Sequence, residues 1–98
     1  MAATKTAAAV TDGVDAARVF SAEGCTTPRV WANDPGYEYG HHSHDYHKVL
    51  FCLQGSITFH VRGGDVQLAA GDRLDIEPGT VHSATVGPQG VRCMEAAR

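Results

Sequence analysis

Short hydrophobic runs alternate with turn-forming residues from about residue 28 to the end of the chain. The turn signals include residues 34–36 (DPG), 63–64 (GG) and 78–79 (PG), and this spacing is typical of many short antiparallel strands. The segment SITFHVR, residues 56–62, has apolar side chains at every second position, which is the pattern of a strand with one buried face. The two glycines after it predict a two-residue hairpin turn, because glycine adopts positive φ angles without strain. We therefore expect an all-β sandwich or barrel.

The segment KVLFCLQG, residues 48–55, differs because both faces of a strand formed here are apolar. One face carries Leu50 and Cys52, and the other carries Val49, Phe51 and Leu53. Such a strand needs a core on one side and a helix, a terminal segment or a second subunit on the other. Within the chain, only a short helix before residue 24 and the segment around residue 31 offer that cover. We therefore predict a homodimer that pairs through this face.

The N-terminal part of the chain has a different pattern of residues, which does not indicate short strands. Residues 15–24, DAARVFSAEG, predict one short helix, with Ala16, Val19 and Phe20 on a loose apolar face and Gly24 at its end. Residues 1–11 are rich in alanine and threonine and hold nothing large to bury, so a disordered tail is expected there. The predicted organisation is this tail followed by a single domain over residues 12–98.

Composition narrows the classes of function. The 98 residues carry 8 Lys and Arg against 11 Asp and Glu, a net charge of −3, and no basic run points to nucleic acid as a partner. No apolar stretch approaches the roughly 20 residues of a membrane span, and the apolar run at residues 7–10 is shorter than the core of a secretory signal. The three cysteines lie far apart with no CxxC pair, which is typical of a reduced, cytoplasmic protein.

Candidate chemistry begins with the segment GHHSHDYHK, residues 40–48, which holds four of the six histidines. In a strand, His42 and His44 project from the same face, about 7 Å apart along the backbone. Both imidazoles can then reach one metal ion at about 2.0–2.1 Å. His41 has the opposite parity and is expected to face away from them.

A second segment, GDRLDIEPGTVH, residues 71–82, supplies a third histidine. Pro78 and Gly79 suit the two central positions of a type II turn, since proline fixes the first φ angle and glycine accepts a positive φ at the second. His82 lies three residues beyond Gly79, at the entry to an apolar strand. Three neutral imidazoles that converge from two segments form a transition-metal site with open positions for water or substrate.

Together these two segments resemble the two sequence motifs of the cupin superfamily, over roughly residues 36–95. The matching positions are His42, His44 and Gly55 in the first motif and Gly71, Gly79 and His82 in the second. Glu77 stands where the family has a proline. The resemblance implies a small jelly-roll β-barrel that holds a divalent transition-metal ion, namely iron, manganese, nickel, copper or zinc, near its wider mouth.

One position departs from the family pattern, because Lys48 stands where the first motif has a glutamate ligand. A protonated ammonium cannot bind a metal ion, and His47 is the nearest replacement. If His47 faces inward, the site has four histidine ligands: His42, His44, His47 and His82. If parity runs strictly from Leu50, then Lys48 faces inward and can anchor an anionic substrate instead. A β-bulge would decide between these two arrangements.

The sequence supports two functions on this barrel. The first is a metal-binding cupin-domain protein that acts as a small-molecule oxygenase. The alternative is a non-catalytic module that binds or senses a small ligand; a structural metal would usually have four protein ligands. Trp31, Tyr37 and Tyr39 either line the pocket mouth or pack within strands or at a dimer seam. No residue is assigned a catalytic role, and the expected partner is a small molecule.

Overall fold

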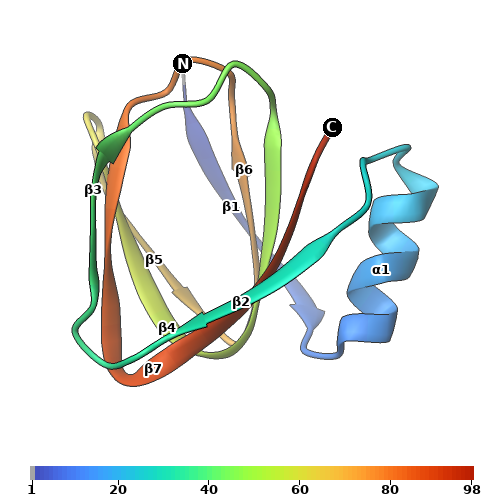
Figure 1. Cartoon of the computed structure of the whole chain (residues 1–98), viewed down its shortest axis with the longest axis horizontal. Coiled ribbons are helices and arrows are strands. Elements are labelled where there is room, and N and C mark those ends of the chain that lie inside the picture. The colour runs from blue at the N-terminus through green and yellow to red at the C-terminus, as the bar shows by residue number, and fades with distance from the viewer. Residues whose placement is uncertain (1) are drawn as a thin grey trace.

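Two long strands, β4 (Lys48–Val61) and β7 (His82–Ala97), form the centre of the fold. The computed structural model describes residues 2–98. Its hydrogen-bonded strand order is β1-β6-β4-β7-β2, with β3 paired to β7 and β5 paired to β4. The strands curl around a common interior, and the helix packs outside them (Figure 1). The remaining elements are β1 (Ala3–Val10), α1 (Gly13–Ala22), β2 (Arg29–Asn33), β3 (Glu38–His42), β5 (Gly64–Ala69) and β6 (Gly71–Ile76). This confirms the predicted all-β jelly-roll fold with one short helix.

A bulge in β4 brings the apolar residues of both its halves to the interior. Cys52 and Ile57 are both buried inside although five positions separate them, because the pairing with β7 shifts on either side of Gly55. Gly55 has a φ of +73°, and a Cβ atom there would lie 1.9 Å from the carbonyl oxygen of Gly90. Only glycine fits this position. The other core residues are Leu50, Phe59, Leu68, Leu74, Ile76, Ala84, Val86, Val91 and Cys93.

The second apolar face of β4 is covered by helix α1. Val49, Phe51 and Leu53 form a cluster with Ala16 and Phe20 of the helix. The rings of Phe20 and Phe51 meet edge to face, with centroids 5.3 Å apart. The helix thus supplies the cover that the sequence analysis assigned to a second subunit. The apolar face of β4 gives no reason to expect a homodimer, which stays a prediction without this support.

Helix α1 begins two residues earlier than the sequence pattern predicts. Asp12 caps it, since its carboxylate accepts hydrogen bonds from the backbone N–H groups of Val14 at 2.7 Å and Asp15 at 3.4 Å. Gly24, with a φ of +71°, follows its end as predicted. No helix within residues 2–98 is long and apolar enough to cross a membrane.

The N-terminal segment is a strand rather than the disordered tail expected over residues 1–11. Strand β1 pairs antiparallel with β6, from Ala3 opposite Ile76 to Val10 opposite Gly71. Met1 lies outside the described residues. Main-chain hydrogen bonds along the edge of β6 hold this strand, and they need no large side chains. Small residues therefore suffice to extend the sheet.

Candidate metal centre

Three histidines from two distant segments meet at one end of the interior. His42 ends β3, His44 lies in the loop after it, and His82 begins β7. Their ring nitrogens include one atom from each residue that lie within 4.8 Å of one another. The ring centroids are 4.2 Å apart for His42 and His82 and 5.3 Å apart for His44 and His82. The structure thus brings together the three residues that the two motifs indicate.

A bulge in β3 decides which histidine faces the interior. Tyr39 is paired with Ala84 and His42 with His82, so three steps along β3 match two steps along β7. Tyr39 and His42 both line the same pocket as a result, although strict alternation would place them on opposite faces. His41 is exposed, as expected from its parity relative to His42.

Backbone carbonyl groups fix the protonation of two of the rings. Nδ1 of His42 lies 2.8 Å from the carbonyl oxygen of Gly40, and Nδ1 of His82 lies 2.9 Å from that of Thr80. A carbonyl oxygen only accepts hydrogen bonds, so each Nδ1 carries the proton and each Nε2 keeps its lone pair. In both residues the nitrogen that is able to bind a metal ion is therefore Nε2.

Two ring nitrogen atoms of the three histidines are buried without a hydrogen-bond partner in the described part of the chain. They are Nε2 of His44 and Nε2 of His82. A buried polar atom without a partner costs roughly 1–3 kcal/mol, which makes two at one point unusual. A metal ion bonded to both would satisfy them, so the residues fit the ion that the resemblance implies.

The turn at residues 78–79 holds the two motifs together. Gly79 has a φ of +79°, and the N–H of Thr80 donates to the carbonyl of Glu77 at 3.2 Å, as in the predicted type II turn. The N–H of Gly79 also donates to the carbonyl of His44 at 2.7 Å. The turn that aims His82 inward therefore also fixes the loop that carries His44.

The surroundings favour the neutral form of the buried imidazoles. Burial lowers the pKa of His44 below its ordinary value, and the positive charge of Lys48 lowers it further. Burial is also the largest cause of the lowered pKa of His82, and it outweighs the hydrogen bond to Thr80, which raises it. Neutral imidazole is the form that binds a metal ion, so the fold favours the ligand form of both residues.

His47 does not join this group. Its Nε2 lies 2.8 Å from Oδ1 of Asp75, and Asp75 is also bonded to the guanidinium of Arg73. Asp75 is paired with Val49, whose side chain packs on the outer face under α1. The four-histidine arrangement is therefore not the one that the structure has. No bulge separates Lys48 from Leu50, so strict parity turns Lys48 inward.

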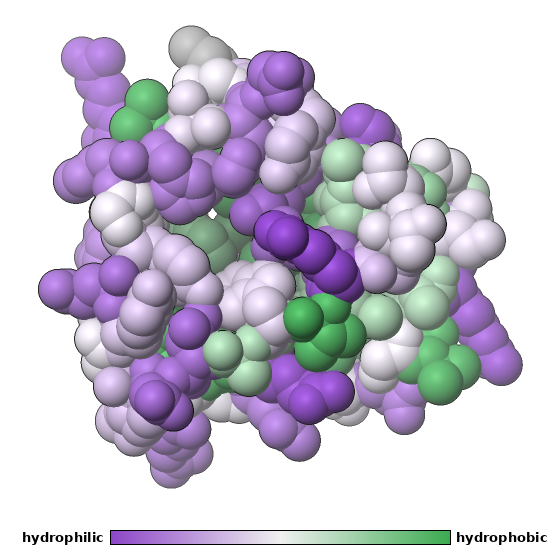
Figure 2. All heavy atoms as spheres, in the orientation of Figure 1, coloured by the Kyte–Doolittle hydropathy of each residue, from purple (hydrophilic) through white to green (hydrophobic). Residues whose placement is uncertain are grey.

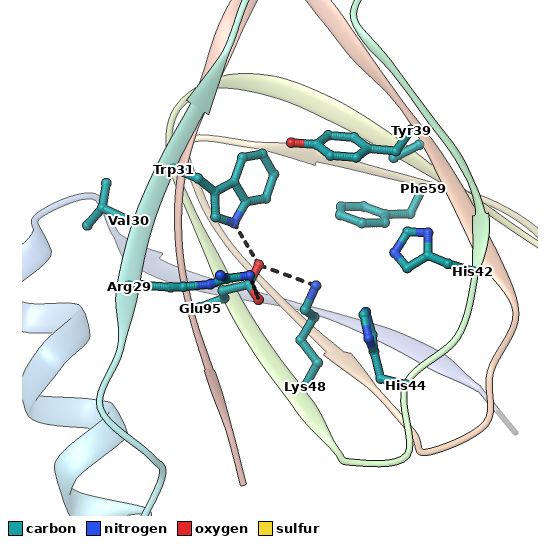
Figure 3. Close-up of a pocket in the computed structure, with 10 residues that line it drawn as sticks. Arg29, Val30, Trp31, Tyr39, His42, His44, Lys48, Phe59 and Glu95 are labelled. Carbon is teal, nitrogen blue, oxygen red and sulfur yellow. Dashed lines mark hydrogen bonds and ion pairs between the residues drawn. The ribbon is translucent and has the colours of Figure 1, made fainter.

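Lys48 instead enters a pocket of about 310 Å³ beside the histidines. Its ammonium nitrogen lies 3.3 Å from Oε1 of Glu95, and the same oxygen accepts a hydrogen bond of 2.6 Å from the indole N–H of Trp31. Figure 3 shows Lys48 between Glu95 on one side and the histidines on the other. Besides His42 and His44, the lining includes Arg29, Trp31, Tyr39, Lys48, Phe59 and Glu95.

The pocket opens to the surface in a mostly hydrophilic surrounding. The space-filling view shows a recess with hydrophobic atoms at its floor, between the positions of β2 and β3 (Figure 2). Trp31 and Tyr39 line the pocket and meet edge to face at 5.7 Å, so of the two roles left open for these residues the pocket role applies. Tyr37 is 47% exposed.

Glu95 and Arg29 are pocket residues that the sequence analysis missed. Glu95 stands two positions after Cys93, which faces the core, so strand parity alone places its carboxylate inside. A charged residue at a position that faces the interior of an apolar strand is the feature that could have identified Glu95 as a pocket residue. Arg29 gives no such signal, because its side chain is 78% exposed and reaches Glu95 only at 3.7 Å.

Comparisons with known proteins agree with this architecture. The profile of the family described as the AraC-like ligand binding domain matches residues 29–94. A segment of 43 residues, 43% of the chain, is 42% identical to quercetin 2,3-dioxygenase of Bacillus subtilis (strain 168). That match spans only 13% of the dioxygenase.

Solved structures extend the likeness to the whole fold. An RmlC-like cupin from Shewanella frigidimarina superposes with a TM-score of 0.65 and 25% identity, over 72% of this chain and 63% of its own. A DUF861 family protein from Thermotoga maritima superposes with a TM-score of 0.69 over 99% of this chain and 100% of its own, at 14% identity. The second match shows the fold alone, and it includes the N-terminal strand and helix.

Proposed function

This chain belongs to the AraC-like ligand-binding domain family, a cupin-type domain, and from that premise we propose that it is a metal-binding protein that acts on a small molecule as an oxygenase. The ligands of the divalent transition-metal ion are His42, His44 and His82. The observation that carries the proposal is the pair of buried Nε2 atoms on His44 and His82 that have no hydrogen-bond partner in residues 2–98. The match to part of a dioxygenase supports the reaction class.

The chain's own groups prepare the site in two ways. The carbonyls of Gly40 and Thr80 orient two imidazoles and fix their protons on Nδ1. Burial favours the neutral form of His44 and His82 by lowering their pKa values. A redox-active divalent ion held by these three neutral ligands would supply Lewis acidity toward an oxygen-bearing ligand and one-electron chemistry with O2.

A specific observation also favours the second function, that of a binding or sensing module. Among residues 2–98, Glu95 is the only carboxylate in the pocket lining, and it is held by Trp31 and Lys48. A general base with a free acceptor toward the ligand is therefore not evident in the part of the pocket that the structure describes. The family description also names ligand binding rather than catalysis. The pocket itself serves either function equally well.

The test begins with the metal content of the protein as isolated and after loading with ferrous ion. The wild type and the variants His42→Ala, His44→Ala and His82→Ala are compared with His47→Ala, a histidine outside the group. We expect about one metal ion per chain in the wild type and His47→Ala, and strongly reduced metal in the other three. Undiminished metal in all three variants contradicts the proposed site.

Oxygen uptake then separates the two functions. The ferrous protein is supplied with a panel of small thiols, diketones and phenols, and dissolved oxygen is followed over time. Uptake that requires both metal and substrate, and that is lost in His82→Ala, supports the oxygenase. Saturable binding of a panel member without uptake supports the binding module instead.

A further inference from the structure

The ammonium group of Lys48 has hydrogen-bonding capacity that the protein does not use. Its side chain is only 9% exposed, and it points into the pocket beside His44 (Figure 3). Within residues 2–98, its one partner is Oε1 of Glu95, an ion-pair contact at 3.3 Å. An ammonium group carries three N–H donors, so two of them remain for whatever occupies the pocket.

The charges of the pocket lining also leave an excess of positive charge. Arg29 and Lys48 contribute +1 each and Glu95 contributes −1, which gives a formal sum of +1 with the histidines neutral. Glu95 is enclosed by the indole N–H of Trp31, the ammonium of Lys48 and the guanidinium of Arg29. Its negative charge is therefore largely screened from an occupant, and a bound divalent ion would make the pocket more positive still.

The rest of the wall is apolar and aromatic. Trp31, Tyr39 and Phe59 line the pocket together with Ala84. The volume of about 310 Å³ is at the lower end of the range of roughly 300–1,000 Å³ for small-molecule sites. These walls suit a flat body about the size of one ring and offer it few hydrogen bonds.

We propose that this pocket selects a small organic anion, a carboxylate or enolate on a flat apolar body, and that Lys48 is the residue that determines this specificity. The anionic group accepts a hydrogen bond from an N–H of Lys48 that Glu95 leaves unused, and the apolar body lies against Trp31, Tyr39 and Phe59. The inference rests on the proposed function, since it names the ligand class of the same site. It concerns binding, so it holds for the oxygenase and for the sensing module.

The test compares anions with neutral molecules of the same shape. Benzoate, phenylacetate and phenylpyruvate are each titrated against the matching amide, and chemical-shift changes report the dissociation constants. The titrations use both chelator-treated and zinc-loaded protein. For at least one pair we expect the anion to bind about 10- to 100-fold more tightly, which is the range for one hydrogen bond to a charged group. The preference should already exist in the metal-free protein.

Two variants connect the preference to Lys48. Lys48→Met removes the ammonium, and Lys48→Met with Glu95→Gln also removes the carboxylate that would otherwise lose its partner in a buried place. Lys5→Met is the matched control, because Lys5 is half exposed, pairs with Asp72 at 3.6 Å and does not line this pocket. We expect the preference for anions to disappear in both pocket variants and to persist in the control.

Several outcomes overturn the inference without touching the proposed function. One is a metal-free wild type that binds no anion, or binds anions no better than amides. Another is a preference that survives in the double variant, or one that depends on zinc but not on Lys48. Metal content is measured in the same samples by elemental analysis. A wild type that binds no metal would contradict the proposed function, whereas normal metal content with no effect of Lys48 contradicts only this inference.

Discussion

Lys48 and Glu95 form an ion pair that lies diagonally across two neighbouring strands, with 3.3 Å between Nζ and Oε1 and both side chains more than nine-tenths buried. Lys48 stands opposite Ala97, and Glu95 stands opposite Leu50, so the pair spans the inner face of β4 and β7. Taking two charges out of water is costly, and their attraction offsets this only when both partners are present. Each residue therefore depends on the other.

Removing one partner should destabilise the protein more than removing both. Lys48→Met leaves a buried carboxylate, so we expect the free energy of unfolding to fall by about 3 kcal/mol or more. In the double variant with Glu95→Met, the loss should be much smaller, because no unpaired charge remains. Urea unfolding of the wild type, both single variants and the double variant gives the coupling between them. Additive losses would show that the two charges do not stabilise each other.

Part of this site was predictable because it depends on residues close together in the sequence. His42, His44 and His82 lie in short motifs whose spacing is local, and the turn at residues 78–79 has its own chemistry. The bulge in β3 that turns Tyr39 and His42 to the same side and the absence of a bulge after Lys48 follow from pairing with distant strands. The sequence alone therefore does not decide whether His47 or Lys48 faces the interior. The register of β4 with its neighbouring strands decides it.

The elements that the sequence analysis missed depend on long-range pairing. Strand β1 consists mainly of small residues, and its main-chain bonds to β6 leave no mark in the hydrophobic pattern. The hairpin turn is formed by Arg62 and Gly63, since Gly64 is already paired with Val61. It lies one residue earlier than the two glycines predict. The register of the paired strands sets the position of the turn, and the turn residues alone do not fix it.

A bound metal ion should raise the thermal stability of the domain. At a free metal concentration of 100 times the dissociation constant, binding adds about 2.7 kcal/mol, which corresponds to a rise in Tm of roughly 10–20 °C for a chain of this size. Melts with zinc and with chelator test this, and His82→Ala should melt at the same temperature in both. Identical Tm values for metal-loaded and metal-free wild type would contradict a site formed by the folded protein.

The pH dependence of this stabilisation has a definite sign. Metal binding requires neutral imidazoles, and burial lowers the pKa of His44 and of His82. The ligand forms therefore persist somewhat below the ordinary histidine pKa, and the difference in Tm should shrink only at more acidic pH. Melts at half-unit steps from pH 7.5 to pH 4.5 locate the change. A Tm difference that stays constant over this range would argue against histidine ligands.

Gly55 should tolerate no side chain. An alanine Cβ there would lie 1.9 Å from the carbonyl oxygen of Gly90, a backbone atom that cannot move alone, and the φ of +73° adds strain. Gly36 is the matched control, since its φ is +75° and nothing lies within 4 Å of an added Cβ. We expect Gly36→Ala to cost about 1–2 kcal/mol and Gly55→Ala clearly more. Equal losses in urea unfolding would show that only the φ angle matters.

Asp75 should contribute stability that is lost in acid. Burial raises its pKa, but hydrogen bonds from Arg73 and His47 outweigh this, so the net pKa is below the ordinary value of 3.8. A carboxyl group with a lowered folded pKa stabilises the native state above its unfolded pKa, and this contribution disappears as the pH falls through the folded pKa. Asp75→Asn should therefore be less stable at pH 7 and lose less stability between pH 5 and pH 3.

The control for this prediction is Asp34→Asn, because Asp34 is exposed. It should keep the acid dependence of the wild type. Unfolding free energies in urea at several pH values compare the three proteins. If Asp75→Asn and the wild type lose stability in parallel as the pH falls, then the contacts with Arg73 and His47 do not favour the ionised carboxyl group.

The last prediction concerns the helix that covers β4. Phe20 is 1% exposed and packs against Phe51, whereas Val14 on the same helix is 62% exposed. Phe20→Ala removes a large side chain from the outer cluster and should lower the free energy of unfolding by about 3–5 kcal/mol. Val14→Ala should change it by less than about 0.5 kcal/mol. Because α1 shields the apolar face of β4, loosening it should also increase self-association, which sedimentation velocity measures against Val14→Ala. If Phe20→Ala is as stable as Val14→Ala and self-associates no more than it does, then the helix is not the element that covers this face.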